Sequence, residues 1–253
     1  MAADLAATLA NRENLQRNAN LLYWYRRLYD QVFGGCSDGY MASVLEIGSG
    51  VSPLKRIFPD VITSDILPLS HVDLVFDCHK IDEVSAISDA SLEAITCTNV
   101  IHHLQRPAEF LVKAAAKLKP GGKILAVEPY FSWLSTPIFR WLHHEPCDFT
   151  IERPELASPG GPLSMSNQAL AHMLFLTQPQ WLEPLRELYD VEGMRISHFT
   201  GLSYMASGGI SRKLPIPAGL YRAGFAIDHF LARKWPKVFA SFFIVEMTRK
   251  GMA

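Results

Sequence analysis

The chain has 253 residues, of which 49% are hydrophobic and 19% charged, enough apolar material for a large buried core and too much for a disordered chain. Its 24 Lys and Arg residues nearly balance its 25 Asp and Glu residues, so overall charge does not hold the chain on nucleic acid. The length suits one large domain, and we treat residues 1–253 as a single domain.

The cysteines and the apolar segments indicate a cytoplasmic protein. Cys36, Cys78, Cys97 and Cys147 form no C-x-x-C pair, so neither a zinc knuckle nor a disulfide framework is predicted. The N-terminal residues lack the basic start and the apolar core of a signal peptide. No run of 18 apolar residues occurs, because charged residues interrupt the most hydrophobic stretch, 214–247. We therefore expect a cytoplasmic chain without a membrane span.

The first half of the chain alternates predicted helices with short predicted strands. Apolar side chains at helical intervals predict a helix over residues 3–33, so that residues 1–40 form an N-terminal helical cap. A second helix is predicted from Pro107 to Leu118, and Pro120-Gly121-Gly122 follows it. Strands separated by helices or loops indicate a parallel sheet that is covered on both faces. Short apolar runs predict five strands, at residues 44–47, 61–64, 72–76, 92–98 and 123–127.

The second half begins with an irregular segment. Residues 130–178 contain five prolines, the pair Gly160-Gly161 and many aromatic residues, so we expect an insertion of short helices. Because the insertion directly follows the fifth strand, it is expected to form a lid over the substrate. The remaining predictions are a helix at 180–189, a loop at 207–217 and strands at 191–199 and 242–248.

A glycine-rich turn is the strongest local signal in the sequence. Gly48-Ser49-Gly50 directly follows a predicted strand, where glycines let a ligand lie against the backbone. A dinucleotide fingerprint would need a third glycine at the position of Pro53, which disfavours an NAD-dependent oxidoreductase. In a parallel sheet the strand ends share one edge, where ligands bind. Polar residues stand just before this turn and at the ends of later strands: Glu46, Asp65, Asp77 and Asn99.

Five motifs, in chain order, resemble those of class I S-adenosylmethionine-dependent methyltransferases. The resemblance covers about residues 43–129 and implies S-adenosylmethionine as the cofactor. It further implies a Rossmann-like α/β sheet of seven mostly parallel strands with helices on both faces. The last strand, 242–248, would insert antiparallel. The motifs are Val44–Gly50, Asp65 at a strand end, Phe76–Cys78, Thr98–Leu104 and Leu118–Lys123.

The resemblance assigns the methionine and ribose parts of the cofactor to the first two motifs. Glu46 and the turn Gly48-Ser49-Gly50 would surround the methionine part, and Asp65 would hold the ribose hydroxyls. A carboxylate suits a ribose because it accepts charge-assisted hydrogen bonds from hydroxyl groups. The alternative for Glu46 is a buried acid that pairs with the backbone or a lysine, and for Asp65 it is the capping of a turn.

The resemblance assigns the adenine and the sulfonium of the cofactor to the next two motifs. Asp77, together with the backbone of Cys78, would contact the adenine, and Asn99 would line the sulfonium side. The alternative for Asp77 is again the capping of a turn. The crossover after Asp65 is shorter than the family's, because no helix is predicted before the next strand.

Two histidine pairs are candidates for the chemistry of the methyl acceptor. Transfer of a methyl group from a sulfonium is an in-line displacement, so the protein supplies positioning and, for a hydroxyl acceptor, a base. Histidine suits this task near neutral pH. We therefore predict catalytic roles for His103, which follows the fourth strand, and for His144 and Glu145 in the insertion. The alternative is a histidine of the cavity wall or the core.

The second pair also raises the question of a metal. His143-His144-Glu145 has Asp148 nearby, but neither H-x-x-x-H nor H-x-H spacing occurs in this segment. No metal is therefore predicted there.

The predicted function is S-adenosylmethionine-dependent methyl transfer to a small-molecule, saccharide or lipid-linked acceptor, at an oxygen. The alternative is a non-catalytic S-adenosylmethionine-binding module with a regulatory or partner-binding role. From Arg195 to Ala253 the sequence contains nine Lys and Arg residues and two acids, whereas the first 194 residues carry a net charge of −8. The basic C-terminal region suggests an acidic acceptor or peripheral contact with an anionic membrane, and nucleic acid is disfavoured. The alternative is a solvated basic helix face.

Overall fold

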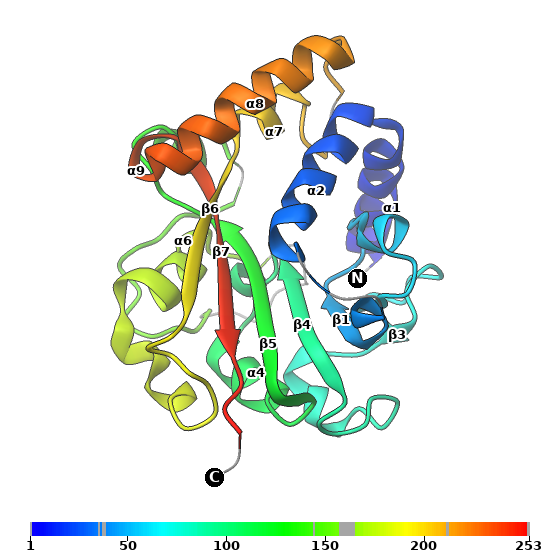
Figure 1. Ribbon diagram of the computed structural model, residues 1–253, viewed down its shortest axis with the longest axis vertical. Coiled ribbons are helices and arrows are strands. Elements are labelled where there is room, and N and C mark those ends of the chain that lie inside the picture. The colour runs from blue at the N-terminus through cyan, green and yellow to red at the C-terminus, as the bar shows by residue number, and fades with distance from the viewer. Residues whose placement is uncertain are drawn as a thin grey trace.

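A seven-stranded sheet in the order β3-β2-β1-β4-β5-β7-β6 forms the centre of the computed structural model, which describes residues 2–34, 36, 39–143, 145–156, 165–210 and 213–251 (Figure 1). β7 is antiparallel to β5 and β6, whereas the other neighbouring strands are parallel. This confirms the predicted Rossmann-like α/β fold with an antiparallel last strand. The strands are β1 (Val44–Ile47), β2 (Ile62–Asp65), β3 (Leu74–Val75), β4 (Leu92–Thr98), β5 (Leu118–Pro129), β6 (Arg195–Thr200) and β7 (Ala240–Thr248).

Helices lie against both faces of the sheet. α4 and the π-helix η5 pack on one face, and α2 and α8 pack on the other (Figure 1). The α-helices are α1 (Ala2–Arg17), α2 (Ala19–Val32), α3 (Leu54–Ile57), α4 (Pro107–Ala114), α5 (Ser135–Pro137), α6 (Ala169–His172), α7 (Leu202–Ala206), α8 (Ala218–Lys234) and α9 (Pro236–Phe239). The 3-10 helices are η1 (Tyr40–Ser43), η2 (Cys78–Glu83), η3 (Ile101–His103) and η6 (Pro179–Leu185), and the π-helices are η4 (Ile138–Leu142) and η5 (Met173–Thr177).

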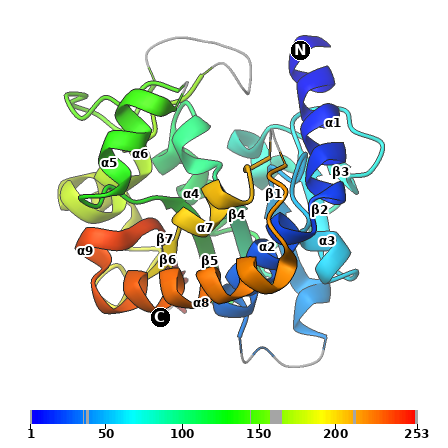
Figure 2. The ribbon, with the colours of Figure 1, turned by 90° about the horizontal axis from the view of Figure 1, so that it is seen from above.

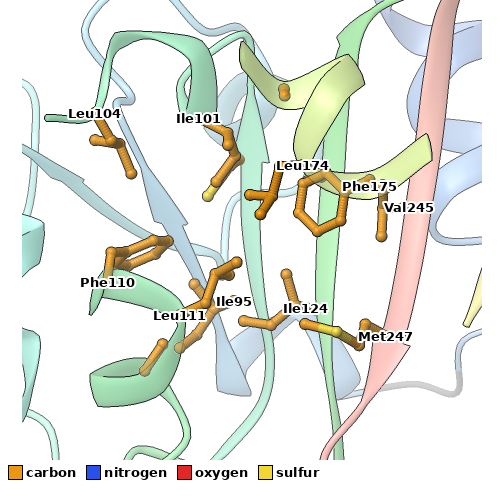
Figure 3. Packing of buried hydrophobic residues seen from close by; sticks show 14 of the residues in the cluster. Ile95, Ile101, Leu104, Phe110, Leu111, Ile124, Leu174, Phe175, Val245 and Met247 are labelled. Carbon is orange, nitrogen blue, oxygen red and sulfur yellow. The ribbon is translucent and has the colours of Figure 1, made fainter. Parts of the chain in front are cut away.

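The alternation of side chains along the central strands divides the core into two clusters. Ile124 of β5 joins the cluster beneath α4 and η5, whereas its neighbour Leu125 joins the cluster beneath α2 and α8. This follows from the period of two along a strand, which turns successive side chains to opposite faces. Figure 3 shows the first cluster, where Phe110 and Leu111 of α4 and Phe175 of η5 point toward the strands. Both faces of the sheet are therefore buried, as expected for parallel strands.

The helix predicted over residues 3–33 is two helices. Asn18 separates α1 from α2, and its side-chain oxygen accepts a hydrogen bond of 3.1 Å from Leu21 N as the cap of α2. The Asn18 amide also donates to the carbonyl of Ser207, 2.9 Å away. A capping asparagine favours a new helix start over helix continuation, which explains why the single-helix prediction is wrong at this residue.

Other boundaries also differ from the prediction. Leu118 begins β5 instead of ending the preceding helix, because it pairs with Leu92 in the sheet. β3 is shorter than predicted, since the Asp73 carboxylate accepts the hydrogen bond of Thr63 N. The helix predicted at 180–189 is the 3-10 helix η6, which contains Pro184. β6 begins at Arg195, after a turn in which Gly193 N donates to the Asp190 carboxylate.

The insertion at 130–178 holds the short helices that the sequence predicts. α5, η4, α6 and η5 lie within its described ranges, whereas Gly160-Gly161 lies outside the described residues. Throughout the described chain, no helix is both long enough and apolar enough to cross a bilayer.

Candidate active site

A cavity of about 960 Å³ lies at the carboxyl ends of β1, β2, β3 and β4. Segments from α1, α2, α5 and α7 complete its wall. Figure 2 shows α1 and α5 on opposite sides of this edge of the sheet. The volume is at the upper end of the range for small-molecule sites, which leaves room for a nucleoside cofactor and a second ligand. The lining includes most of the predicted site residues: Gly48, Gly50, Asp65, Asp77, Cys78, Asn99, His103 and Glu145.

The turn after β1 has glycines where no larger residue fits. Gly48 has a φ of +74°, and a Cβ at this position would lie 2.5 Å from a methyl carbon of Val100. A Cβ on Gly50 would lie 2.8 Å from Thr8 Cγ2 and 2.9 Å from Asp65 Oδ2. The turn therefore exposes bare backbone to the cavity, which allows a ligand to approach closely.

Asp65 closes the turn from the end of β2. Its Oδ2 accepts a hydrogen bond of 2.8 Å from Gly50 N, and its Oδ1 accepts one of 2.9 Å from Leu67 N. Burial raises the pKa of Asp65, and the hydrogen bonds from Leu67 and Gly50 act against this rise. Each carboxylate oxygen has a second lone pair, so Asp65 can accept further hydrogen bonds from a ligand in the cavity.

Asp77 caps the helix that follows β3. Its Oδ1 accepts from His79 N at 3.0 Å and lies 2.8 Å from His79 Nδ1. Burial alone would raise the pKa of Asp77, but the hydrogen bonds from His79 bring it below its ordinary value. Asp77 and Cys78 both line the cavity, so turn capping and ligand contact are compatible at this strand end.

Glu46 and Ser49 lie behind the turn and are not among the residues that line the cavity. Ser52 Oγ donates to Glu46 Oε1 at 2.5 Å, and Ser49 Oγ donates to the Glu46 carbonyl at 3.2 Å. In the described part of the chain, Glu46 Oε2 is buried without a hydrogen-bond partner. Burial raises the pKa of Glu46 to about 7. Both residues thus support the turn from beneath.

Glu128, at the end of β5, organises the other half of the cavity. Its Oε1 accepts from Val100 N at 3.0 Å and from Ile101 N at 2.7 Å, and its Oε2 lies 2.5 Å from His102 Nδ1. Glu128 is fully buried, and His102 is 2% exposed. The same turn holds Asn99 at a φ of +56°, so the Glu128 carboxylate fixes a backbone of unusual conformation.

The two adjacent histidines differ in protonation, because one ring is cationic and the other is neutral. Burial lowers the pKa of His102, but the carboxylates of Glu128 and Glu145 raise it to about 9, so His102 is an imidazolium at neutral pH. Burial and the neighbouring charge of His102 lower the pKa of His103 to about 4, so His103 is neutral. His103 Nδ1 lies 3.1 Å from the carbonyl of Met165, which assigns the single proton of its ring to Nδ1.

Glu145 enters this cluster from the insertion. Its Oε2 lies 3.4 Å from His102 Nε2, and its Oε1 lies 3.6 Å from His103 Nε2. Burial raises the pKa of Glu145, but its contact with His102 brings it down to about 2. The Gln168 amide donates to the Glu145 carboxylate. The structure therefore brings together His103 and Glu145 of the predicted catalytic residues, whereas His144 lies outside the described residues.

His102 and Glu128 belong to this cluster although we predicted a catalytic role for neither from the sequence, and Gln168 joins it without any predicted role. Glu128 stands at the end of a strand, as Asp65 and Asp77 do, and that position was a usable signal. Gln168 had no such signal, because it is a polar residue of the insertion 66 positions from His102.

Comparison with known proteins identifies the family of this chain. The sequence profile described as a methyltransferase domain matches residues 11–188, which is more than half of the chain. The chain belongs to the methyltransferase-domain family. The matched range contains the glycine turn, the three strand-end acids Asp65, Asp77 and Glu128, and the His102–His103 pair.

This methyltransferase also resembles individual proteins. It is 30% identical over 111 residues to a ubiquinone biosynthesis O-methyltransferase of Idiomarina loihiensis, and the match spans 43% of each chain. A chain in the complex between the Haloferax volcanii Trm112 methyltransferase activator and a methyltransferase shares 13% identity with it. The coverage there is 96% of this chain and 98% of the other, with a TM-score of 0.50, which shows the same fold. An S-adenosylmethionine-dependent methyltransferase of Archaeoglobus fulgidus is 18% identical, with coverages of 92% and 96% and a TM-score of 0.47.

S-adenosylmethionine is the cofactor of this methyltransferase, and the cavity suits it. The Gly48–Gly50 turn offers backbone where any Cβ would clash, and the Asp65 carboxylate beside it faces the same space. Asp65 and Asp77 place two carboxylates in the lining of this half of the cavity, and such charges favour a cationic sulfonium. When bound, the cofactor supplies an activated methyl group.

Proposed function

We propose that this methyltransferase transfers a methyl group from S-adenosylmethionine to an oxygen of a small-molecule, saccharide or lipid-linked acceptor. The observation that carries the proposal is that one cavity contains both the glycine turn with Asp65 and the His103–Glu145 cluster. The first half suits the cofactor and the second suits a hydroxyl. A non-catalytic module would have no use for the second half.

In this proposal each wall of the cavity holds one part of the cofactor. Asp65 accepts hydrogen bonds from the ribose hydroxyls, and Asp77 with the backbone of Cys78 contacts the adenine. Gly48 and Gly50 lie against the methionine part. Glu46 and Ser49 support the glycine turn from the side that faces away from the cavity. Asn99 lines the same cavity as the glycine turn and His103, and in this proposal it lies on the sulfonium side.

The acceptor oxygen binds on the other side of the sulfonium, against His103 and Glu145. The ionised Glu145 carboxylate and the neutral His103 ring can each accept the hydrogen bond of a hydroxyl group. During transfer the bond from carbon to sulfur breaks, a bond from carbon to oxygen forms, and the hydroxyl proton passes to His103 Nε2. His144 stays a predicted member of this group.

A comparison of S-adenosylhomocysteine with NAD as ligands tests the half of the cavity proposed to bind the cofactor. At about 100 times its dissociation constant, S-adenosylhomocysteine is expected to stabilise the protein by about 2.7 kcal/mol. For a protein of this size that raises the melting temperature by roughly 5–10 °C. NAD is expected to give no rise, because Pro53 replaces the third glycine of its fingerprint. Differential scanning fluorimetry measures both, and the reverse ranking of the two ligands would refute the proposal.

The outer face of α8 and α9 favours a lipid-linked acceptor. Five apolar side chains there are exposed, and Asp228, the one acid between residues 213 and 245, is buried against Ser203 N. Lys234 Nζ lies over the rings of Phe230 and Trp235, at 5.6 and 4.8 Å from their centroids. An apolar face flanked by cations of the same segment suits the surface of an anionic bilayer. The apolar residues are Leu220, Ile227, Phe230, Trp235 and Val238, and the cations are Arg222, Arg233, Lys234 and Lys237.

This face adjoins the cavity through α7. Tyr204 and Met205 of α7 line the cavity, and Ser203 of the same helix bonds to Asp228 of α8. A protein resting on a bilayer through α8 would thus bring its cavity close to acceptors in that bilayer. Trp133, 77% exposed, extends the face, since its N donates to the carbonyl of Lys237 in α9.

Vesicle sedimentation tests this surface. The wild type is expected to pellet with vesicles of phosphatidylglycerol and phosphatidylcholine, less so as salt rises, and not with phosphatidylcholine alone. The double variant Ile227→Glu, Phe230→Glu is expected to bind at least about 10-fold more weakly, because it loses apolar burial and adds repulsion. Leu9→Glu, on an exposed apolar residue of α1, is the matched control. Equal binding by the double variant and the control would contradict the membrane contact.

A further inference from the structure

We infer that His102, His103 and Glu145 form a site for one divalent cation of the zinc class, with an open position toward the cavity. In this proposal, Nε2 of each histidine and a Glu145 oxygen are the ligands. One ligand atom from each residue lies within 4.8 Å of the other two, and all three residues line the cavity. Two imidazoles and one carboxylate are a ligand set that binds zinc and leaves a fourth position open.

The spacing of the ligand atoms fits an ion between them. Glu145 Oε2 lies 3.4 Å from His102 Nε2, and Glu145 Oε1 lies 3.6 Å from His103 Nε2. Both distances are long for a direct hydrogen bond. A tetrahedral ion with bonds of about 2.0–2.1 Å holds its ligand atoms roughly 3.4 Å apart. The three side chains need little movement to enclose a cation.

The other nitrogen of each ring is already held in the way that metal-binding histidines require. His102 Nδ1 donates to the buried Glu128 carboxylate, and His103 Nδ1 donates to the carbonyl of Met165. Binding of the ion therefore displaces one proton, the Nε2 proton of the His102 imidazolium. Such partners orient the ring and direct Nε2 to the ion. Both Nε2 atoms therefore face the Glu145 carboxylate across the same space.

Gln168 supplies an independent observation. Its side chain is 3% exposed, and its Oε1 is buried without a hydrogen-bond partner among the described residues. Its Nε2 lies 3.3 Å from His102 Nε2 and donates to Glu145. The amide thus contacts two of the three proposed ligands, His102 and Glu145. Rotation of the amide would turn its partnerless oxygen toward a cation.

A second cluster in the described chain, Asp77–Cys78–His79, lacks these properties. Both ring nitrogens of His79 are engaged, Nδ1 with Asp77 and Nε2 as the acceptor of Arg106 N. This cluster serves as the internal comparison for the experiment.

The role of the cation rests on the proposed function. An acceptor hydroxyl bound at the open position would lose its proton to solvent more readily, since coordination lowers its pKa. The resulting oxygen would then form the new bond to the methyl carbon as the bond from carbon to sulfur breaks. With the ion bound, His103 and Glu145 act as its ligands and are not themselves the base.

Cobalt spectroscopy tests the site without any acceptor. The full-length protein, treated with EDTA and dialysed, is titrated with CoCl₂ and then with ZnCl₂. We expect one equivalent of Co²⁺ to give visible absorption bands of a four- or five-coordinate ion, which Zn²⁺ removes. Glu145→Gln and His103→Gln are each expected to weaken Co²⁺ binding at least about 100-fold, whereas His229→Ala on α8 and His79→Ala leave it unchanged.

Two results would overturn the inference. One is the absence of stoichiometric Co²⁺ binding by the folded wild type, and the other is loss of binding in His79→Ala with retention in Glu145→Gln. The melting-temperature rise with S-adenosylhomocysteine, measured on the same samples, reports folding and the cofactor half separately. A sample that binds Co²⁺ but not S-adenosylhomocysteine would refute the proposed function and leave the cation site standing. The reverse result would refute only the cation site.

Discussion

Replacing Asp65 by alanine is expected to abolish the rise in melting temperature that S-adenosylhomocysteine gives to the wild type. Asp65 lines the cavity, and each of its carboxylate oxygens has capacity for a hydrogen bond beyond the one it accepts from the backbone. Two charge-assisted bonds to the ribose hydroxyls are together worth about 3 kcal/mol or more, so the affinity is expected to fall at least about 100-fold. Isothermal titration calorimetry measures this loss directly.

The control must account for the structural bonds of Asp65. Its carboxylate also accepts from Gly50 N and Leu67 N, so Asp65→Ala lowers the melting temperature of the free protein as well. Asp73→Ala is the matched variant, because Asp73 accepts from Thr63 N in the same way but does not line the cavity. We expect Asp73→Ala to keep the full response to S-adenosylhomocysteine. A folded Asp65→Ala protein with wild-type affinity would exclude a ribose contact.

Glu128→Ala is expected to cause the largest loss of stability of any single substitution considered above. The change leaves the His102 imidazolium buried without its main partner and leaves Val100 N and Ile101 N unpaired. Removing one partner of a buried ion pair costs about 3–5 kcal/mol. The melting temperature is then expected to fall by roughly 6–20 °C. Denaturation in guanidinium chloride, followed by circular dichroism, measures the free energy of unfolding.

A double-mutant cycle separates the ion pair from the backbone contacts. Glu128→Gln and His102→Gln are made singly and together, and the double variant is expected to cost less than the sum of the singles. Asp30→Asn breaks an ion pair with Arg27 in which both side chains are exposed, and it is expected to cost less than about 1 kcal/mol. If Glu128→Ala cost no more than Asp30→Asn, Glu128 would not organise the turn.

The parts of the fold that depend on local sequence could be predicted. Val44–Ile47 is a short apolar run that ends in glycines, and Pro107 opens a helix as expected. The predictions fail where a tertiary contact decides the structure. Asn18 ends one helix and caps the next while bonding to Ser207, which is 189 residues away. Leu118 belongs to a strand only because Leu92 pairs with it.

The candidate site divides in the same way. The strand-end positions of Asp65 and Asp77 follow from the topology of a parallel sheet, so their place in the cavity could be predicted. Glu46 stands just before the glycines, yet side-chain alternation along β1 places its carboxylate beneath the turn. There it accepts a hydrogen bond from Ser52 Oγ. The meeting of Glu145 with His102 depends on the path of an irregular insertion. No pattern in the sequence specifies that path.

The antiparallel insertion of β7 has a consequence for the order of folding. β6 pairs only with β7, and β7 lies between β5 and β6, so β6 cannot join the sheet before residues 240–248 are available. During synthesis, β1 to β5 can pair with one another first, whereas β6 pairs only after β7, the next strand in the chain, has been made. Ser241 and Phe242 at the start of β7 line the cavity, so the pocket closes last. A nascent chain therefore completes its sheet and its binding pocket in a single late step.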